Sequence, residues 1–173
     1  MLLPRDCVRL TLCAVALAVT MACSQPAPAP AAPPPATPPV DTAAVAAQVK
    51  AAIKTQVDAY AARDVARAAS ILADDVVAHF HGAPNVVGRT AAMAGMKEQM
   101  ADPALKLAVA GESVDVAAAG DIAVYHATYT FTFTNPATKK TGSETGNWVA
   151  VFKRQADGTM KLSRDMVLDM PGK

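Results

Sequence analysis

The stretch Asp64–Gly95, DVARAASILADDVVAHFHGAPNVVGRTAAMAG, decides the fold because its apolar periodicity changes twice. Helical spacing predicts a short helix over 64–75. VVAHFHG (76–82) is typical of a strand, and APNVVG (83–88) of a turn and return. RTAAMAGMKEQMA (89–101) predicts a further helix, whose methionine stripe we interpret as core rather than as a soft-metal site.

The flanking segments complete an α+β pattern. DTAAVAAQVKAAIKTQVDAYAARD (41–64) predicts one long helix that Asp41 or Thr42 can cap. From Leu105 onward the period becomes two, as in strands. Four strands are expected, LKLAVAGESVDVAAAG (105–120), DIAVYHATYTFTFTN (121–135), GSETGNWVAVFKRQ (142–155) and TMKLSRDMVLDM (159–170). Helices followed by antiparallel strands predict helices packed on one face of a sheet.

The first 23 residues have the layout of a secretory leader. A cationic start is followed by an uncharged apolar run and then by small residues that lead to Cys23. The run is shorter than the roughly 20 residues that span a bilayer. We expect a lipoprotein signal peptide over 1–22, lipidation of Cys23, and a chain anchored to an envelope membrane, facing the periplasm or the exterior. Plain secretion is the alternative.

A proline-rich segment separates the leader from the domain. Eight of the fourteen residues from 26 to 39 are proline, which favours extended polyproline II. We interpret 23–40 as a tether, although a proline-rich recognition ligand is a second reading. Residues 41–173 then suit one domain.

Composition excludes several classes of function. All three cysteines lie in the leader, so the mature domain has no thiolate for zinc or for nucleophilic catalysis. Without the leader's Arg5, Arg9 and Asp6, the 16 basic and 15 acidic residues become 14 of each. There is no basic stripe, and we expect no nucleic-acid partner.

Two histidines, His79 and His81, alternate around Phe80 in the first predicted strand. Side chains two residues apart share a strand face, and a zinc site needs three or four ligands. With one further histidine in the chain, we interpret the pair as a polar strand face and expect no metal or cofactor. A catalytic role for His79 stays open, because a bulge would exchange the two faces.

The stretch 64–95, followed by ETGNWVAVFKRQADGTMKLSRDMVLDMP (144–171), resembles the SnoaL-like, ketosteroid-isomerase-like domains of the nuclear transport factor 2-like superfamily. The ADD helix exit, the GR before the third helix and the final hairpin VFKRQADGTMKLSRD carry the likeness, which covers nearly all of 45–171. It implies an α+β cone, in which about three helices pack on a curved antiparallel sheet around an apolar pocket. It also implies a homodimer.

Steroid isomerases of this family use an aspartate base with a tyrosine and a protonated aspartate as donors. Alignment on ADD puts the base at Phe80, the tyrosine at Gln56 and the second donor near Trp148. Phe80 cannot accept a proton, and Gln56 is a weaker donor than a phenol. The resemblance therefore argues against steroid-type isomerisation.

The same resemblance implies a set of pocket residues, Gln56, Tyr60, Phe80, His126, Trp148, Asp165 and Val167. A carboxyl in an apolar cone has a raised pKa, so Asp165 with Tyr60 or His126 could do acid–base work. Alternatively, Asp165 pairs structurally with an arginine or a backbone group. The aromatic stripe of strand 122–134 is either core or the outer face of the sheet, buried in a dimer. The family register favours the second alternative, because it turns His126 inward.

Three functions remain open at this point. The first is binding of a small, largely apolar molecule in the pocket. The second is isomerase, lyase or hydrolase chemistry with Asp165, Tyr60 and His126 as catalytic residues. The third is a non-catalytic dimeric module that binds a partner protein.

Overall fold

The computed structural model describes residues 40–170. The elements in chain order are α1 (Thr42–Ala62), α2 (Val65–Ala69), β1 (Leu72–Phe80), β2 (Val86–Val87), α3 (Arg89–Met100), β3 (Lys106–Val116), β4 (Ile122–Thr134), β5 (Thr141–Arg154) and β6 (Met160–Asp169). The predicted leader, Cys23 and nearly all of the predicted tether lie outside the described residues. Within 40–170, no helix is long and apolar enough to cross a membrane.

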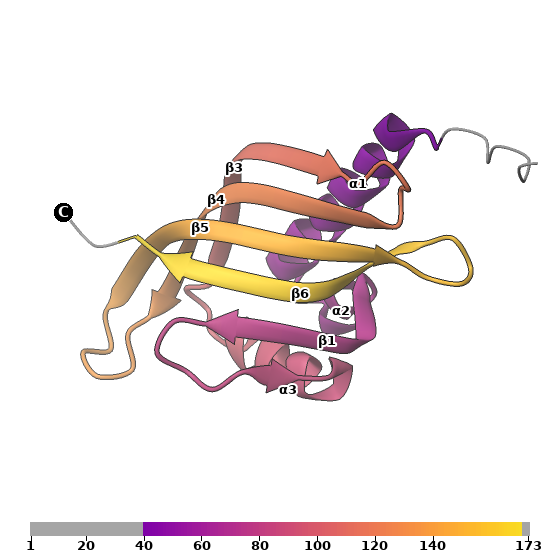
Figure 1. The fold of residues 1–173 in the computed structure, drawn as a ribbon. Coiled ribbons are helices and arrows are strands. Elements are labelled where there is room, and N and C mark those ends of the chain that lie inside the picture. Colours follow the sequence, from indigo (N-terminus) through magenta and orange to yellow (C-terminus); the bar gives the residue numbers. More distant parts are fainter. Residues whose placement is uncertain (1–39, 171–173) are drawn as a thin grey trace, which may run out of the picture. The chain divides into compact units, whose positions relative to one another are not determined.

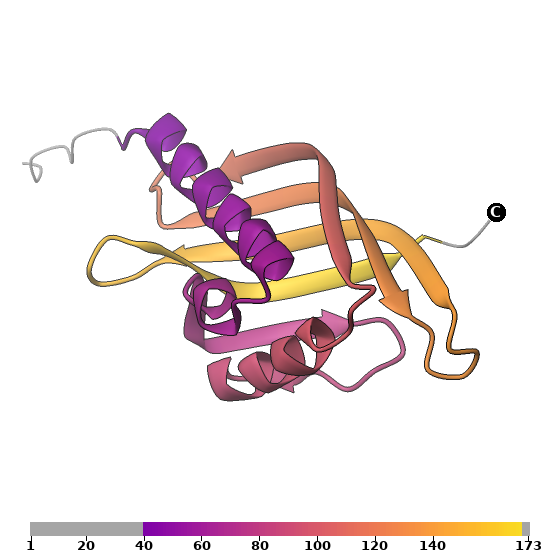
Figure 2. The ribbon, with the colours of Figure 1, turned by 180° about the vertical axis from the view of Figure 1, so that it is seen from behind.

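The strands within residues 40–170 form one six-stranded sheet in the order β2-β1-β6-β5-β4-β3. Neighbours are antiparallel except β1 and β6, which run parallel. The three helices lie against one face of the sheet, with α1 crossing β3 and β4 and with α3 beside β1 (Figures 1 and 2). The predicted α+β class, with helices packed on one face of a curved sheet, is confirmed.

Helix α1 is specified by a cap at its N-terminus and by a buried face along one side. The Asp41 carboxylate caps it by accepting from the Ala44 N–H at 2.9 Å. Val49 and Ile53 are fully buried one turn apart, and each contributes roughly 2 kcal/mol through burial. Gln56 continues this stripe and is also buried, with 3% of its surface exposed. One polar side chain therefore interrupts the apolar face that the helix turns to the sheet.

The predicted helix over 64–75 is wrong in its second half. Helix α2 ends at Ala69, and β1 already begins at Leu72. Leu72 pairs with Leu162 of β6, so the sheet takes residues that helical spacing alone assigned to the helix. Tertiary pairing overrides the local pattern here.

The GR motif before α3 joins three elements. Gly88 has φ 85°, a left-handed backbone that favours glycine. The Arg89 guanidinium donates to the Ala69 carbonyl at the end of α2 at 2.9 Å. It also donates to the Asp74 carboxylate on β1 at 3.2 Å. The ADD and GR motifs are therefore linked directly, through Asp74 and Arg89.

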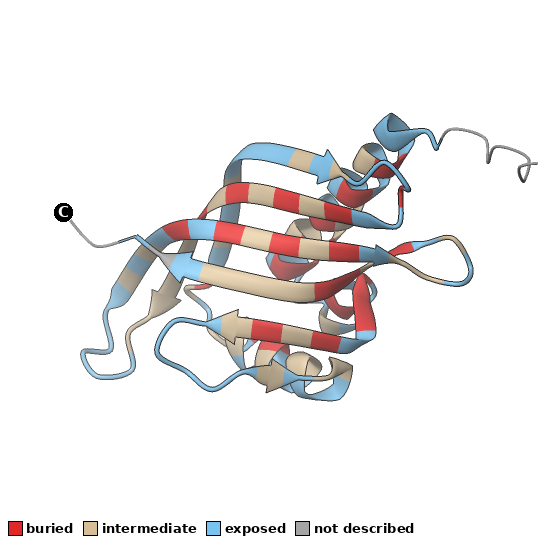
Figure 3. Cartoon of the chain, viewed as in Figure 1, coloured by how far each residue is buried: buried red, intermediate tan, exposed pale blue. Residues whose placement is uncertain are grey.

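The aromatic stripe of β4 faces the helices, contrary to the expected register. Tyr125 and Tyr129 are 0% and 3% exposed, whereas His126 between them is only half-buried (Figure 3). Ala127 is the cross-strand partner of Trp148, and directly paired residues share a face. Trp148 and His126 cannot both point inward, so the prediction that His126 turns inward is wrong.

A bulge bends β3 over α1. Gly111 has φ 66°, and the β3–β4 register shifts between Ala110 and Ser113. The extra residue sharpens the local twist and curves the strand. Glu112, at this bulge, accepts from the Tyr125 hydroxyl at 2.8 Å.

Candidate functional site

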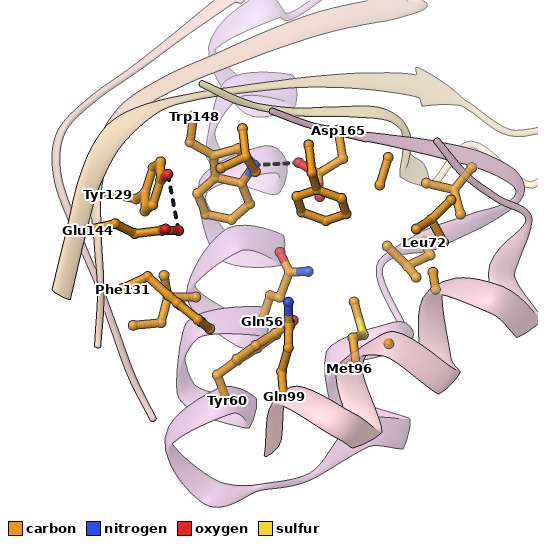
Figure 4. Close-up of a pocket in the computed structure, with 18 residues that line it drawn as sticks. Gln56, Tyr60, Leu72, Met96, Gln99, Tyr129, Phe131, Glu144, Trp148 and Asp165 are labelled. Carbon is orange, nitrogen blue, oxygen red and sulfur yellow. Dashed lines mark hydrogen bonds between the residues drawn. The ribbon is translucent and has the colours of Figure 1, made fainter. Parts of the chain in front are cut away.

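A pocket of about 170 Å³ lies between the helices and the covered face of the sheet (Figure 4). Its lining residues are Gln56, Tyr60, Leu72, Val76, Ala78, Phe80, Val86, Ala92, Gly95, Met96, Gln99, Leu107, Tyr129, Phe131, Glu144, Trp148, Asp165 and Val167. They come from α1, α3 and all six strands of the described residues. Apart from two glutamines, one glutamate and one aspartate, the lining is apolar or aromatic.

Asp165 of β6 is one of two residues with a carboxylate that line the pocket. The Trp148 indole N–H donates to its Oδ1 at 2.5 Å. Burial raises the pKa of Asp165 to about 6, although the Trp148 hydrogen bond and the nearby His79 imidazole both lower it. This carboxyl therefore changes charge near neutral pH. The expected pairing with an arginine or a backbone group is wrong, since the indole takes that place.

Two glutamines differ in how their amides are satisfied. The Tyr60 hydroxyl donates to Gln99 Oε1 at 2.8 Å, which joins α1 to α3 (Figure 4). Burial, with a smaller contribution from the Asp165 charge, raises the pKa of Tyr60 far above its ordinary value. Gln56 Oε1 is buried and accepts from no described residue. A buried acceptor without a donor costs about 1–3 kcal/mol.

Glu144 brings a second carboxylate to the pocket. It accepts from the Tyr129 hydroxyl at 3.4 Å (Figure 4). The Tyr129 ring lies directly over Gly146, its cross-strand partner. A Cβ on Gly146 would lie 2.5 Å from the ring's Cε1, so only glycine leaves room for the tyrosine there.

Six of the seven residues expected in the pocket line it, and the seventh, His126, does not. His126 Nε2 lies on the outer face, 3.7 Å from the Asp115 carboxylate, with 45% of its side chain exposed. The cluster of Asp165 with Tyr60 and His126 is therefore not assembled. Of Tyr60 and His126, it is Tyr60 that lines the pocket together with Asp165.

His79, one of the two histidines of β1 and the turn after it, contacts the turn before β2. His79 Nδ1 lies 2.9 Å from Asn85 Oδ1 in the turn before β2. Within residues 40–170, no group of three or more His, Cys, Asp or Glu side chains is arranged to hold a metal ion. Phe80, between the histidines, borders the pocket with 36% of its surface exposed.

Sequence reasoning missed Glu144 and Gln99. Glu144 shares the even-numbered face of its strand with Trp148, so its inward direction followed from parity once Trp148 was placed. Gln99 lies three residues after Met96 in the methionine helix, which is one helical turn. In both elements, the missed residue was a polar side chain on a face already assigned to the core.

Comparisons with known proteins agree with this architecture. Residues 53–162 match the SnoaL-like domain family, and the chain belongs to that family. No curated protein matches the sequence significantly.

Solved structures share the fold at low sequence identity. A nuclear transport factor 2-like superfamily protein from Salmonella enterica has a TM-score of 0.64 at 16% identity, covering 76% of this chain and 94% of that chain. A ketosteroid isomerase-like protein from Erwinia carotovora atroseptica has a TM-score of 0.60 at 18% identity, covering 73% and 96%. An NTF2-like protein with a cystatin-like fold from Novosphingobium aromaticivorans has a TM-score of 0.60 at 17% identity, covering 73% and 82%.

Proposed function

We propose that this chain is a binding protein of the cell envelope whose pocket holds a small, largely apolar molecule. The observation that carries the proposal is the pocket lining, in which a few polar groups stand among apolar and aromatic side chains. Ligand sites have this composition, with polar groups that orient an otherwise apolar ligand.

Gly95 on α3 supports the same reading. It lines the pocket, and a Cβ built on it meets no heavy atom within 4 Å. A glycine inside a helix costs about 0.5–1 kcal/mol relative to alanine. The chain therefore keeps open space at a position where a larger residue would stabilise the helix.

The pocket can be tested by filling it. We expect extracts of the purified full chain to contain a co-purifying small molecule by mass spectrometry, and Gly95→Leu to lose it. Ala94→Leu, on the exposed side of the same helix, is the matched control and should keep it. Equal recovery of the molecule from Gly95→Leu and from the unaltered chain would contradict the proposal.

The envelope location rests on the leader and Cys23. We expect the chain to fractionate with membranes and Cys23→Ser to be released from them, since acylation supplies the anchor. Retention of Cys23→Ser in the membrane fraction would refute lipid anchoring, but it would not contradict the proposal that the pocket binds a ligand.

A second candidate function is acid–base catalysis by Asp165 on the bound molecule. A carboxyl with a pKa of about 6 can exchange a proton near neutral pH. Incubation of the co-purified compound with the chain in deuterium oxide tests this. Deuterium incorporation that Asp165→Asn abolishes would favour catalysis, and an unlabelled compound would favour binding alone.

A further inference from the structure

We infer that the ligand of this pocket is an organic cation, a protonated amine that carries an apolar or aromatic body. The inference rests on the proposed binding function and names its ligand class. Three independent properties of the lining point to it, namely its charge, its hydrogen-bond donors and its aromatic rings.

The lining carries acidic groups and no basic ones. Asp165 and Glu144 both border the pocket, and none of its described lining residues is lysine, arginine or histidine. Carboxylates around an apolar space disfavour an anionic ligand and attract a cation.

One buried acceptor of the lining lacks a donor among residues 40–170. The indole N–H of Trp148 donates to Asp165, and the Tyr60 hydroxyl donates to Gln99. Gln56 Oε1 is the buried acceptor that no described residue satisfies. An ammonium group has donors and no acceptor, so it matches a site that offers acceptors.

Aromatic rings surround the same space. Five of the lining side chains are aromatic, Tyr60, Phe80, Tyr129, Phe131 and Trp148. Ring faces attract cations, most strongly where water is excluded, and sites for ammonium ligands use such rings. The rings also accommodate the apolar body of the ligand.

Ligand binding should depend on pH, because the titratable Asp165 lines the pocket. The titratable groups that interact with its carboxyl are Tyr60 of α1 and His79 of β1, and Glu144 of β5 lines the same pocket. Burial raises the pKa of Asp165 to about 6, and a bound cation would favour the charged carboxylate. Amine affinity should therefore rise between pH 5 and pH 7.5.

The fluorescence of Trp148 can be used to measure ligand binding. Trp148 is the single tryptophan in the chain and lines the pocket, so fluorescence titration reports this site alone. The probes are 2-phenylethylamine, 2-phenylethanol and 3-phenylpropionate, which share a benzene ring and differ in head-group charge. We expect the amine to bind about tenfold or more tightly than the alcohol, and the carboxylate to bind least.

Two variants separate charge from shape. Asp165→Asn keeps an oxygen that can accept from Trp148 and removes the charge, so the preference for amine over alcohol should fall to about threefold or less. Asp115→Asn, a carboxylate of the outer face with 83% of its side chain exposed, should keep the full preference.

The outcomes distinguish the inference from the function it rests on. If the alcohol binds as tightly as the amine, or the carboxylate binds more tightly, the cation inference fails while a binding pocket stands. If Asp165→Asn keeps the full preference, the inference also fails. If no probe changes the fluorescence and the chain carries no co-purifying molecule, the proposed function fails as well.

Discussion

The indole N–H of Trp148 reaches the carboxylate of Asp165 diagonally across β5 and β6, at 2.5 Å. Trp148 pairs directly with Val167, and Asp165 pairs with Ala150, so the bond joins residues two positions out of register. Diagonal neighbours on a sheet face are within reach of long aromatic side chains. The bond fixes the orientation of the carboxyl in the pocket.

The pH dependence of stability should change when this carboxyl is removed. A folded pKa raised from 3.8 to about 6 means that the folded chain binds more protons than the unfolded chain between these values. Asp165 therefore lowers stability as pH rises through this interval. We expect Asp165→Asn to gain about 1–3 kcal/mol relative to the unaltered chain between pH 4 and pH 7.

Urea unfolding at pH 4 and pH 7 measures this difference. Asp121→Asn, at an exposed position, is the control and should follow the unaltered chain at both values. A difference between Asp165→Asn and the unaltered chain that stays constant with pH would show that the folded-state pKa is not raised.

Two glutamine substitutions should have opposite signs. Gln56→Leu removes a buried acceptor without a donor, and we expect it to stabilise the empty domain by about 1 kcal/mol. Gln99→Leu leaves the Tyr60 hydroxyl without its acceptor and should destabilise by about 1–3 kcal/mol. Thermal unfolding compares the two, and a loss of stability in Gln56→Leu would mean that its amide is already satisfied.

Glycine at position 146 should resist substitution. A Cβ there would overlap the Leu168 carbonyl and the ring of Tyr129, so Gly146→Ala should cost about 1–3 kcal/mol. Gly142 on the same strand is the control, because its nearest neighbour, Phe133 Cζ, would be 3.4 Å from an added Cβ. Denaturant unfolding of the two alanine variants tests this, and equal stabilities would contradict it.

Asp102 should stabilise the domain most strongly above its pKa. Its carboxylate accepts from the Thr134 hydroxyl at 2.7 Å and from the Ala104 N–H at 2.9 Å. Hydrogen bonds, first those from Thr134, hold the pKa of Asp102 below its usual 3.8. We expect Asp102→Ala to be less stable at pH 7, with a gap that narrows below pH 3.8 in thermal unfolding. If the difference in stability between the variant and the unaltered chain widened below pH 3.8, the pKa of Asp102 would not be lowered in the folded state.

The long elements could be predicted because their periodicity extends over many residues. Helix α1 and the four long strands lie close to the expected ranges, and Asp41 is the cap that the sequence offered. The end of α2 could not be predicted, because the start of β1 at Leu72 depends on pairing with Leu162, 90 positions further on. Local spacing carries no information about such a partner.

The sheet face on which His126 lies depends on the register of the β4–β5 hairpin. The alternation of residue types along the strand does not reveal this register. Trp148 pairs with Ala127 because the turn brings Thr134 opposite Thr141. A connection one residue longer or shorter would have paired Trp148 with a residue of the other face. Alternation correctly grouped the aromatic residues of β4 on one face, but only the register shows that this face turns toward the helices.

The central place of β6 in the sheet has a consequence for biogenesis. Strand β6, the last strand within residues 40–170, lies between β1 and β5, so the sheet stays in two parts until residues 160–169 have been synthesised. Native contacts between distant segments form late and slow folding. We therefore expect a chain that ends before residue 160 to leave β1 and β5 unpaired on the sides that β6 would occupy, and to be degraded rather than to persist as a shortened domain.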